Sequence, residues 1–346
     1  MEQTTSPALL EGSVQPRMDS KVPSCTVFRH GKAGASPEGF AQISEILREE
    51  GALVWFDMVD PSSDDLAVLQ EEFGLHPLAI EDAVHAHERS KIESYDTYWF
   101  VILEAATVAD AGIGFHEMAI FAGVNFVVTV RHAPAYPLEE VKRRWQTHPS
   151  ELQRSAGFLL YTILDTVVDG YIPVAETFQV RVDQLEENLF TRQPNHDRVL
   201  ADIFEMKKEA QHFRRAVLPM RDILNPIIRQ DIRLYPEQDN AYFRDIYDHA
   251  IRVIEHLDTL RDLMTSALEI HLSVLGNRQN EVAKQLTVIA TIFLPLTFVT
   301  GFFGQNFGLL VGTFLPSPWV FWVFGIGLEL ATLFVTLGYF KRKGWF

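Results

Sequence analysis

A Gly-Gln-Asn tripeptide, Gly304-Gln305-Asn306, directly follows a stretch of 18 residues without charge, Leu286–Phe303. The amide oxygen of Asn306 could accept hydrogen bonds from the water molecules around a metal ion. Mg²⁺ gives up its water reluctantly, so neutral acceptors of this kind suit a pore mouth that selects a hydrated ion. The alternative is that Asn306 only caps the helix, with Gly304 permitting the sharp turn at its end. A second Gly-x-Asn sequence, Gly123-Val124-Asn125, does not follow a membrane span and is expected by chance.

Two apolar segments, about residues 286–303 and 319–340, are long enough to cross a lipid bilayer as helices. Basic residues flank the pair, whereas the loop Phe307–Pro318 between the segments has no Lys or Arg. The flanking basic residues are Arg278, Lys284, Lys341, Arg342 and Lys343. Cytoplasmic flanks are enriched in Lys and Arg, so we expect both termini in the cytoplasm and a multi-pass protein in the plasma (inner) membrane. The alternative is a buried helical hairpin of a soluble protein.

The composition excludes several classes of function. The 346 residues include 30 Lys and Arg against 46 Asp and Glu, which argues against nucleic acid as a partner and is compatible with divalent cations. The single Cys25 cannot form an internal disulfide or a Cys-based zinc site. No phosphate-binding Gly loop, nucleophile elbow or HExxH sequence is present, so we expect neither an enzyme nor a cofactor.

The segments before the spans predict a cytosolic α/β domain with long helices at 25–235, after a disordered polar tail at 1–24. Runs of β-branched and aromatic residues predict strands. Apolar residues at helical spacing predict helices, some of which begin after a Pro or Ser. The predicted strands are 52–59, 98–108, 117–122 and 125–130, and the predicted helices are 64–73, 78–85, 150–190 and 197–228. Residues 236–285 predict a stalk helix continuous with the first span, and 286–346 a transmembrane domain with a short basic tail.

Apolar residues recur every seven positions along this stalk. They are Phe243, Ala250, Leu257 and Met264, with Ile246, Val253, Leu260 and Ala267 beside them. The pattern indicates either a coiled-coil seam or a face that packs on the preceding helices of the same subunit.

In this context the chain resembles the CorA family of two-span divalent-cation channels. The residues that carry the resemblance lie around the tripeptide, in the cytosolic part and in the tail. They are Ala290–Phe303, Trp55-Phe56-Asp57, Leu75–Asp82, Arg89, Lys91, Glu93, Tyr95, Lys341-Arg342-Lys343 and Trp345. The resemblance extends from about Trp55 to Phe346. It implies a homopentamer with an α/β funnel domain, a stalk helix that continues into the first span, and the second span as an outer ring.

Helical spacing places a set of residues near one face of the first span, which would line the pore. With Leu286 as a further candidate, they are Asn280, Ala283, Thr287, Leu294, Thr297 and Gly301. Thr297 could hydrogen-bond a hydrated ion, and rings of Leu294 and Leu286 could close the path by dewetting. Threonine hydroxyls in membrane helices also bond to backbone carbonyls, and leucines also pack against lipid, so these alternatives stay open. Pro295 should leave a carbonyl near Thr291 without its backbone partner.

Two departures from the CorA pattern bear on the substrate. Gln305 stands where the family commonly has Met, and Phe307–Pro318 has no carboxylate, which is closer to the zinc-transporting ZntB branch. Mg²⁺ uptake, with Co²⁺ or Ni²⁺ as further substrates, is the favoured expectation. A Zn²⁺ transporter, with or without proton coupling, is the alternative, and a membrane-anchored regulatory module without transport is the second.

The resemblance also implies product feedback, in which cytosolic carboxylates bind divalent cations and hold the channel closed. By position Asp82 and Asp245 correspond to these carboxylates, so Mg²⁺ would be both substrate and regulatory ligand. His85-x-His87 is an alternative Zn²⁺ site beside Asp82. Glu329 lies in the middle of the second span, where a charged side chain is expensive. We expect it to be protonated and hydrogen-bonded to a Thr or a backbone carbonyl across a helix interface. A direct role in the ion path, such as a proton relay, is the alternative.

Overall fold

A computed structural model describes residues 23–29, 32–34, 43–85, 89–109, 112–147, 155–189, 196–231, 236–237, 240–305, 312 and 318–345. The chain divides into two compact units, Met1–Thr265 and Ser266–Phe346. Of the predicted tail at 1–24, residues 1–22 lie outside the described part, and Ser24 opens the first strand.

One seven-stranded sheet forms the centre of the first unit, in the order β2-β1-β3-β7-β6-β5-β4. Its strands are β1 (Ser24–Arg29), β2 (Lys32–Ala33), β3 (Ala52–Val59), β4 (Lys91–Tyr95), β5 (Tyr98–Ala109), β6 (Gly112–Gly123) and β7 (Phe126–Arg131). Only β3 and β7 pair in parallel; the other neighbours are antiparallel. The four predicted strands are therefore confirmed, whereas β1, β2 and β4 are additions.

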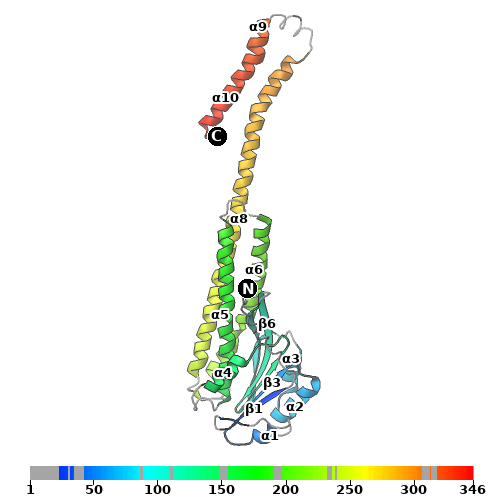
Figure 1. Ribbon diagram of the computed structural model, residues 1–346, viewed down its shortest axis with the longest axis vertical. Helices are drawn as coiled ribbons and strands as arrows, with labels where there is room; N and C mark the ends of the chain where they lie inside the picture. The colour runs from blue at the N-terminus through cyan, green and yellow to red at the C-terminus, as the bar shows by residue number, and fades with distance from the viewer. Residues whose placement is uncertain are drawn as a thin grey trace, which may run out of the picture. The chain divides into compact units, whose positions relative to one another are not determined.

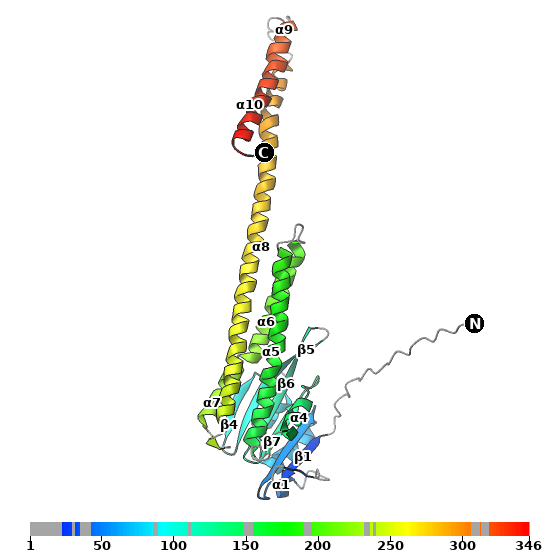
Figure 2. The same cartoon turned by 60° about the vertical axis from the view of Figure 1, so that its left-hand side comes forward.

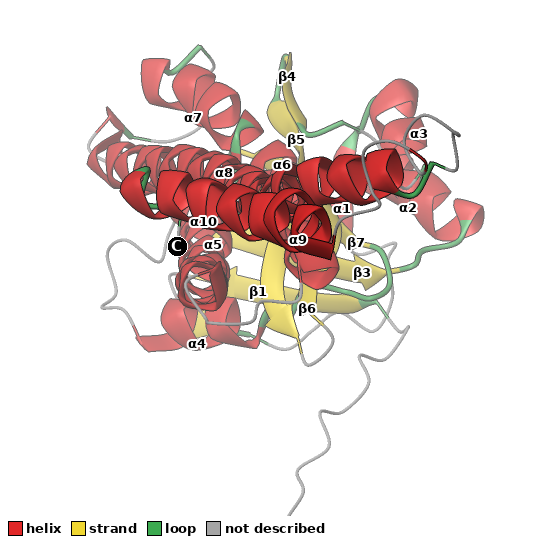
Figure 3. Ribbon diagram, turned by 90° about the horizontal axis from the view of Figure 1, so that it is seen from above, coloured by secondary structure: helices red, strands yellow, loops and turns green. Residues whose placement is uncertain are grey.

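Three short helices cover one face of the sheet: α1 (Ile43–Ile46), α2 (Ser63–Phe73) and α3 (Pro77–Val84) (Figure 3). Alternate residues of the strands, such as Tyr98, Phe100 and Ile102, join the core beneath these helices. α2 begins with a capping box between Ser62 and Asp65 and ends at Gly74, whose φ of 67° suits glycine. α3 begins with Pro77 at its first turn, where the missing N–H costs nothing.

The opposite face packs against a second group of helices, of which α5 makes the most extensive contact with β5 (Figure 2). The group consists of α4 (Glu139–Thr147), α5 (Ala156–Leu189), α6 (His196–Val217) and α7 (Pro219–Arg229). The prediction of one helix over 197–228 was wrong, because the helix is interrupted at Leu218, directly before Pro219. Proline lacks the N–H that would continue the backbone ladder, and it starts α7 instead.

The seven-residue pattern belongs to α8 (Asn240–Phe303), which starts beside α5 in this unit (Figure 1). All eight seam residues are buried within the single chain. Tyr161 of α5 contacts the ring of Phe243, and Arg214 of α6 binds Asp258 at 3.2 Å. Of the two alternatives, packing on the preceding helices of the same subunit is thus confirmed for the seam.

The second unit contains the rest of α8 followed by α9 (Pro318–Val320), the π-helix η5 (Phe321–Gly327) and α10 (Leu328–Arg342). Among the described residues, three helical segments are long and apolar enough to cross a membrane: α5, α8 and Trp322–Arg342. The apolar window of α5 is 67% buried against its own unit, but those of α8 and Trp322–Arg342 are each only 6% buried. A core position explains α5, and the exposed apolar surfaces of the other two are those a bilayer would cover.

The basic tail folds back onto the helices of the second unit. Gly344 adopts a φ of 68°, a conformation that favours glycine, and Trp345 N donates a hydrogen bond to Phe340 O at 3.1 Å. The ring of Trp345 packs at a tilt against the ring of Phe340, with centroids 5.4 Å apart, and its centroid lies 5.5 Å from Nζ of Lys284. This cation–π contact ties the tail to α8.

Candidate functional site

The predicted pore-lining residues all lie on the part of α8 that belongs to the second unit, and all are solvent-exposed in the single chain. They are Asn280, Ala283, Leu286, Thr287, Leu294, Thr297 and Gly301. At 3.6 residues per turn these positions share one side of the helix, with Leu286 at its edge. Leu294 and Leu286 are 75% and 67% exposed, so each is free to meet copies of itself in an assembly.

The threonines on this side keep their hydroxyl protons within the helix. Thr287 Oγ1 donates to Ala283 O, and Thr297 Oγ1 donates to Phe293 O, each at 2.8 Å. The alternative of a bond to a backbone carbonyl is therefore confirmed for both. Both threonines can still contact a hydrated cation, because a hydroxyl that donates its proton keeps lone pairs that accept hydrogen bonds from the water around the ion.

Around Pro295 α8 remains a continuous helix, although proline cannot donate to the carbonyl one turn earlier. Thr291 Oγ1 donates to Thr287 O at 2.7 Å, which is a different carbonyl from the one that Pro295 leaves without its backbone partner. Pro295 thus removes one backbone hydrogen bond at the carbonyl of Thr291, as expected, but the helix does not break there.

α8 ends at Phe303, immediately before the tripeptide. Gly304 N donates to Thr300 O at 2.9 Å, and Gln305 N to Phe302 O at 3.3 Å, which tightens the last turn. A Cβ at position 304 would come within 3.1 Å of Thr300 O, so the turn favours glycine. Asn306 lies outside the described residues, and its role as the ion-selecting amide stays a prediction.

The earlier Gly-x-Asn sequence has a structural role. Asn125 Nδ2 donates to Leu47 O at 2.8 Å, and Gly123 faces the ring of Phe126, where a Cβ would clash. These contacts hold the β6–β7 turn against the segment after α1.

In the first unit, Asp82 and Asp245 lie on different elements, and no hydrogen bond or ion pair of the described structure joins them. Asp82 accepts a bond from Lys91 Nζ at 2.6 Å, and Lys91 also binds Glu93 at 2.7 Å. Although burial opposes it, the hydrogen bonds to these two carboxylates raise the pKa of Lys91. A cation that binds Asp82 must therefore compete with a permanently charged ammonium. His85 Nδ1 contacts Glu81 O at 2.8 Å, and His87 lies outside the described part of the chain.

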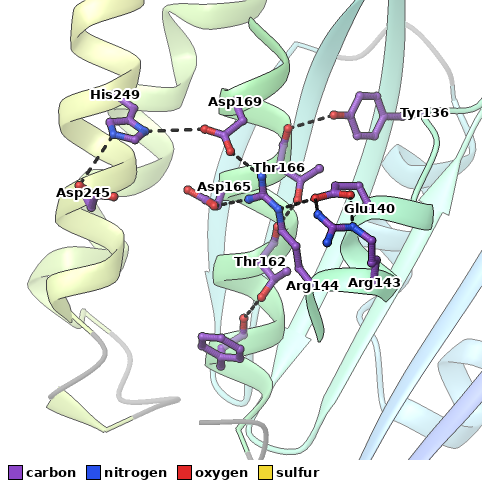
Figure 4. A network of polar contacts seen from close by, with 11 residues as sticks. Tyr136, Glu140, Arg143, Arg144, Thr162, Asp165, Thr166, Asp169, Asp245 and His249 are labelled. Carbon is purple, nitrogen blue, oxygen red and sulfur yellow. Dashed lines mark hydrogen bonds and ion pairs between the residues drawn. The ribbon is translucent and has the colours of Figure 1, made fainter. Parts of the chain in front are cut away.

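Asp245 lies instead at the edge of a polar cluster between α4, α5 and α8 (Figure 4). His249 is 3.8 Å from both Asp245 and Asp169. Asp165, Asp169 and His249 each bring one ligand atom within 4.8 Å of the others, the geometry of a potential metal site. The side chain of Asp245 is 61% exposed, so it is accessible to a neighbouring molecule.

Arg144 already occupies the centre of this cluster. Its guanidinium binds Asp165 at 2.6 Å, Asp169 at 2.7 Å and Glu140 at 2.9 Å. Burial, with the charge of Asp169, raises the pKa of Asp165 to about 6 despite Arg144. Hydrogen bonds from Arg143 and Arg144 lower the pKa of Glu140 to about 2. The arginine thus supplies the positive charge that a metal ion would supply.

Asp57, in the Trp55-Phe56-Asp57 signature, is not available for an ion from solution. Arg131 binds both of its oxygens, at 2.6 and 2.9 Å, and Thr129 Oγ1 donates to it at 2.7 Å. Arg131 also donates to Tyr136 O at 2.6 Å. The two charged side chains are only 4% and 7% exposed, so this part of the signature stabilises the sheet.

A family model described as CorA-like Mg²⁺ transporter protein matches residues 50–342, which include all of these sites. The chain belongs to this CorA-like family. YfjQ of Bacillus subtilis is 31% identical over 308 residues, covering 88% of this chain and 93% of YfjQ. The cobalt/magnesium transport protein CorA of Thermotoga maritima is 30% identical over 310 residues, covering 86% of this chain and 85% of that protein.

The CorA magnesium transporter of Methanocaldococcus jannaschii supplies the structural comparison. Its solved structure matches with a TM-score of 0.71 at 24% identity, over 85% of this chain and 92% of that one. This likeness confirms the expected architecture of a soluble α/β domain, a long helix and C-terminal helices. CorA-like proteins are membrane transporters, so the family is not one of enzymes.

The Asp165–Asp169–His249 cluster of this CorA-like chain was missed in the sequence. Its signal was present as two i,i+4 pairs, Asp165 with Asp169 and Asp245 with His249. Such pairs share one helix face, but nothing local shows that the two faces meet.

Proposed function

We propose that this protein is a homopentameric channel for hydrated divalent metal cations, with Mg²⁺ as the favoured substrate and Co²⁺ or Ni²⁺ as further substrates. Five α8 helices would surround the path, and the second span would form an outer ring in the lipid. The basic flanks of the spans favour a plasma-membrane protein with both termini in the cytoplasm. The gradient and the membrane potential would drive the ion.

The observation that supports this proposal most is the exposed side of α8. Asn280, Thr287 and Thr297 place polar groups at intervals along one exposed side of α8, and the apolar window of this helix is only 6% buried. Polar groups that face lipid are unfavourable, so this side is expected to meet water or a neighbouring subunit. A hydrated ion needs acceptors for its water molecules, and hydroxyl and amide oxygens provide them without the strong attraction of a carboxylate ring.

The test is uptake of Mg²⁺, Co²⁺, Ni²⁺ and Zn²⁺ into vesicles that contain the purified protein. Asn306→Ala should reduce uptake or selectivity at least about tenfold, because several hydrogen bonds to the hydrated ion are lost together. Gln305→Met, which restores the common family tripeptide, should retain transport and serves as the matched control. Unchanged uptake and selectivity in Asn306→Ala would refute the filter, and a wild type without uptake would favour a regulatory module that is only anchored in the membrane.

A Zn²⁺ transporter is the second candidate, because the outer loop has no carboxylate to gather Mg²⁺. Preferred Zn²⁺ uptake that follows an imposed proton gradient would favour it over the Mg²⁺ channel. The assembly itself is tested by native mass spectrometry, in which a pentamer is expected.

We further propose that divalent cations bind between Asp82 of one subunit and Asp245 of the next and favour the closed state. Each carboxylate already has a cationic or histidine neighbour, so the ion must compete for it. Combining Asp82→Ala with Asp245→Ala should make uptake insensitive to Mg²⁺ on the cytosolic side. Asp248→Ala, an exposed carboxylate on the same helix, is the control and should retain inhibition. Normal inhibition in the double variant would contradict the assignment.

A further inference from the structure

Glu329 of α10 meets Thr300 of α8 inside the second unit. Thr300 Oγ1 is 2.6 Å from Glu329 Oε1 and 2.8 Å from Leu296 O. The contact lies in a cleft of about 390 Å³, whose lining also includes Gly304. It therefore connects the second span to the last turn of α8, one turn before the tripeptide.

The two contacts of Thr300 cannot both use the threonine proton, because a hydroxyl has a single proton to donate. Five other threonines of this unit donate to the carbonyl four residues earlier, as Thr300 does to Leu296: Thr287, Thr291, Thr297, Thr332 and Thr336. When Thr300 donates in the same way, Glu329 must supply the proton of the second bond. A carboxylic acid can donate, whereas a carboxylate can only accept.

The surroundings of Glu329 favour the same state. Among the described residues, the cleft is lined by Val299, Thr300 and Phe303 of α8, Gly304 of the turn after it, Gly325 and Ile326 of η5, and Glu329 itself. Glu329 is the only titratable group of this set. Lys284 lies sixteen residues before Thr300 and Lys341 twelve residues after Glu329, about 24 and about 18 Å along their helices. An ionised Glu329 would thus have no countercharge nearby, which is unfavourable within a membrane.

Loss of this proton would act directly on the end of α8. The carboxylate would accept the hydrogen bond that Thr300 otherwise donates to Leu296 O, or it would withdraw from the cleft. The carbonyl of Thr300 accepts the hydrogen bond of Gly304 N, so a shift of Thr300 changes the turn that leads to Asn306. On the other span, η5 directly precedes α10, and π-helical segments are often found at functional sites that move.

We infer that Glu329 is a proton-binding site that positions the pore mouth: its protonated carboxyl donates to Thr300 and holds the Gly304 turn in place. Its effect on transport rests on the proposed channel function, but its proton occupancy does not. The ligand is a single proton, and Glu329 itself need not touch the metal ion.

The test compares the pH dependence of Mg²⁺ uptake in vesicles with the protonation of Glu329 measured by infrared spectroscopy. In the wild type, uptake at alkaline pH should be about two- to tenfold lower than uptake at acid pH, the factor that corresponds to one hydrogen bond. Glu329→Gln keeps an uncharged donor toward Thr300, so it should show the acid-state uptake at every pH. Thr300→Val should also abolish the pH dependence, whereas Thr300→Ser and the control Thr332→Val should retain it.

The infrared measurement of Glu329 protonation does not depend on transport. The wild type at neutral pH should show the carbonyl band of a protonated carboxylic acid, and this band should be missing in Glu329→Gln. Absence of the band in the wild type, or a wild-type pH dependence in Glu329→Gln, would overturn the inference. A wild type that shows the band but takes up no divalent cation would refute the channel function and leave the proton site standing.

Discussion

Replacing Asp57 with alanine should destabilise the soluble unit strongly, because it leaves the buried Arg131 without its counterion. Asp57 accepts three hydrogen bonds, two from Arg131 and one from Thr129, and the Arg131 side chain is only 4% exposed. Removing one partner of a buried pair typically costs about 3–5 kcal/mol. For a unit of this size, that corresponds to a decrease in Tm of about 10 °C.

The measurement is thermal unfolding of the full-length protein in detergent, followed by tryptophan fluorescence. Trp55 is a suitable probe, because its Nε1 donates to Thr129 at 3.3 Å beside the ion pair. Glu49→Ala is the matched control: it breaks the Arg29–Glu49 pair, whose 2.6 Å distance is the same but whose side chains are 43% and 46% exposed. Exposed pairs contribute little in water, so the control should keep the wild-type Tm.

A double variant separates two effects on stability: the loss of the Asp57–Arg131 ion pair, and the burial of the Arg131 charge without its counterion. Combining Asp57→Ala with Arg131→Met removes the uncompensated cation and should recover a substantial part of the lost Tm. Equal Tm values for Asp57→Ala and Glu49→Ala would refute the reasoning, and so would a double variant less stable than Asp57→Ala alone.

Two further outcomes follow from the structure. Leu294→Ala should increase residual Mg²⁺ uptake at high cytosolic Mg²⁺, because a smaller side chain would widen the proposed constriction at this position. Unaltered residual uptake would argue against a gate at Leu294. Burial raises the pKa of Asp165 to about 6, so the folded state binds more protons than the unfolded state between about pH 4 and about pH 6. The free energy of unfolding should therefore fall as the pH rises through this range, by at most about 3 kcal/mol. In Tm measurements, Asp165→Asn should remove this pH dependence. A pH dependence that persists in the variant would assign it to another group.

Local signals sufficed for the regular parts of the fold. β3 has the predicted bounds, Ala52–Val59, because a run of β-branched and aromatic residues is fully compatible with a central strand. The edge strand β4, Lys91–Tyr95, was missed since its Lys and Glu side chains weaken the strand pattern. Those same charges are typical of edge strands, which must avoid pairing with other chains.

Contacts between distant segments could not be predicted in the same way. The heptad pattern of α8 specifies an apolar face but not its partner, and only the fold shows that α5 and α6 cover it. Likewise, the spacing of Asp165 and Asp169 places two carboxylates together on α5, whereas the position of Arg144 depends on how α4 docks. The prediction that Glu329 forms a hydrogen bond to a threonine or a backbone carbonyl across a helix interface was confirmed, with Thr300 as the partner.

The charge distribution of the membrane segment links the proton site to ion selection. Between Lys284 and Lys341 the sequence has one residue of the types Asp, Glu, Lys, Arg and His, which is Glu329. With Glu329 protonated the whole segment is neutral, so a divalent cation in the proposed pore would be stabilised by its retained water and by hydroxyl and amide dipoles. With Glu329 ionised, a pentamer would place five negative charges around the mouth, which would attract cations but also slow their release. In the channel proposed above, a neutral filter for a hydrated ion would therefore require that the proton stay on Glu329 during conduction.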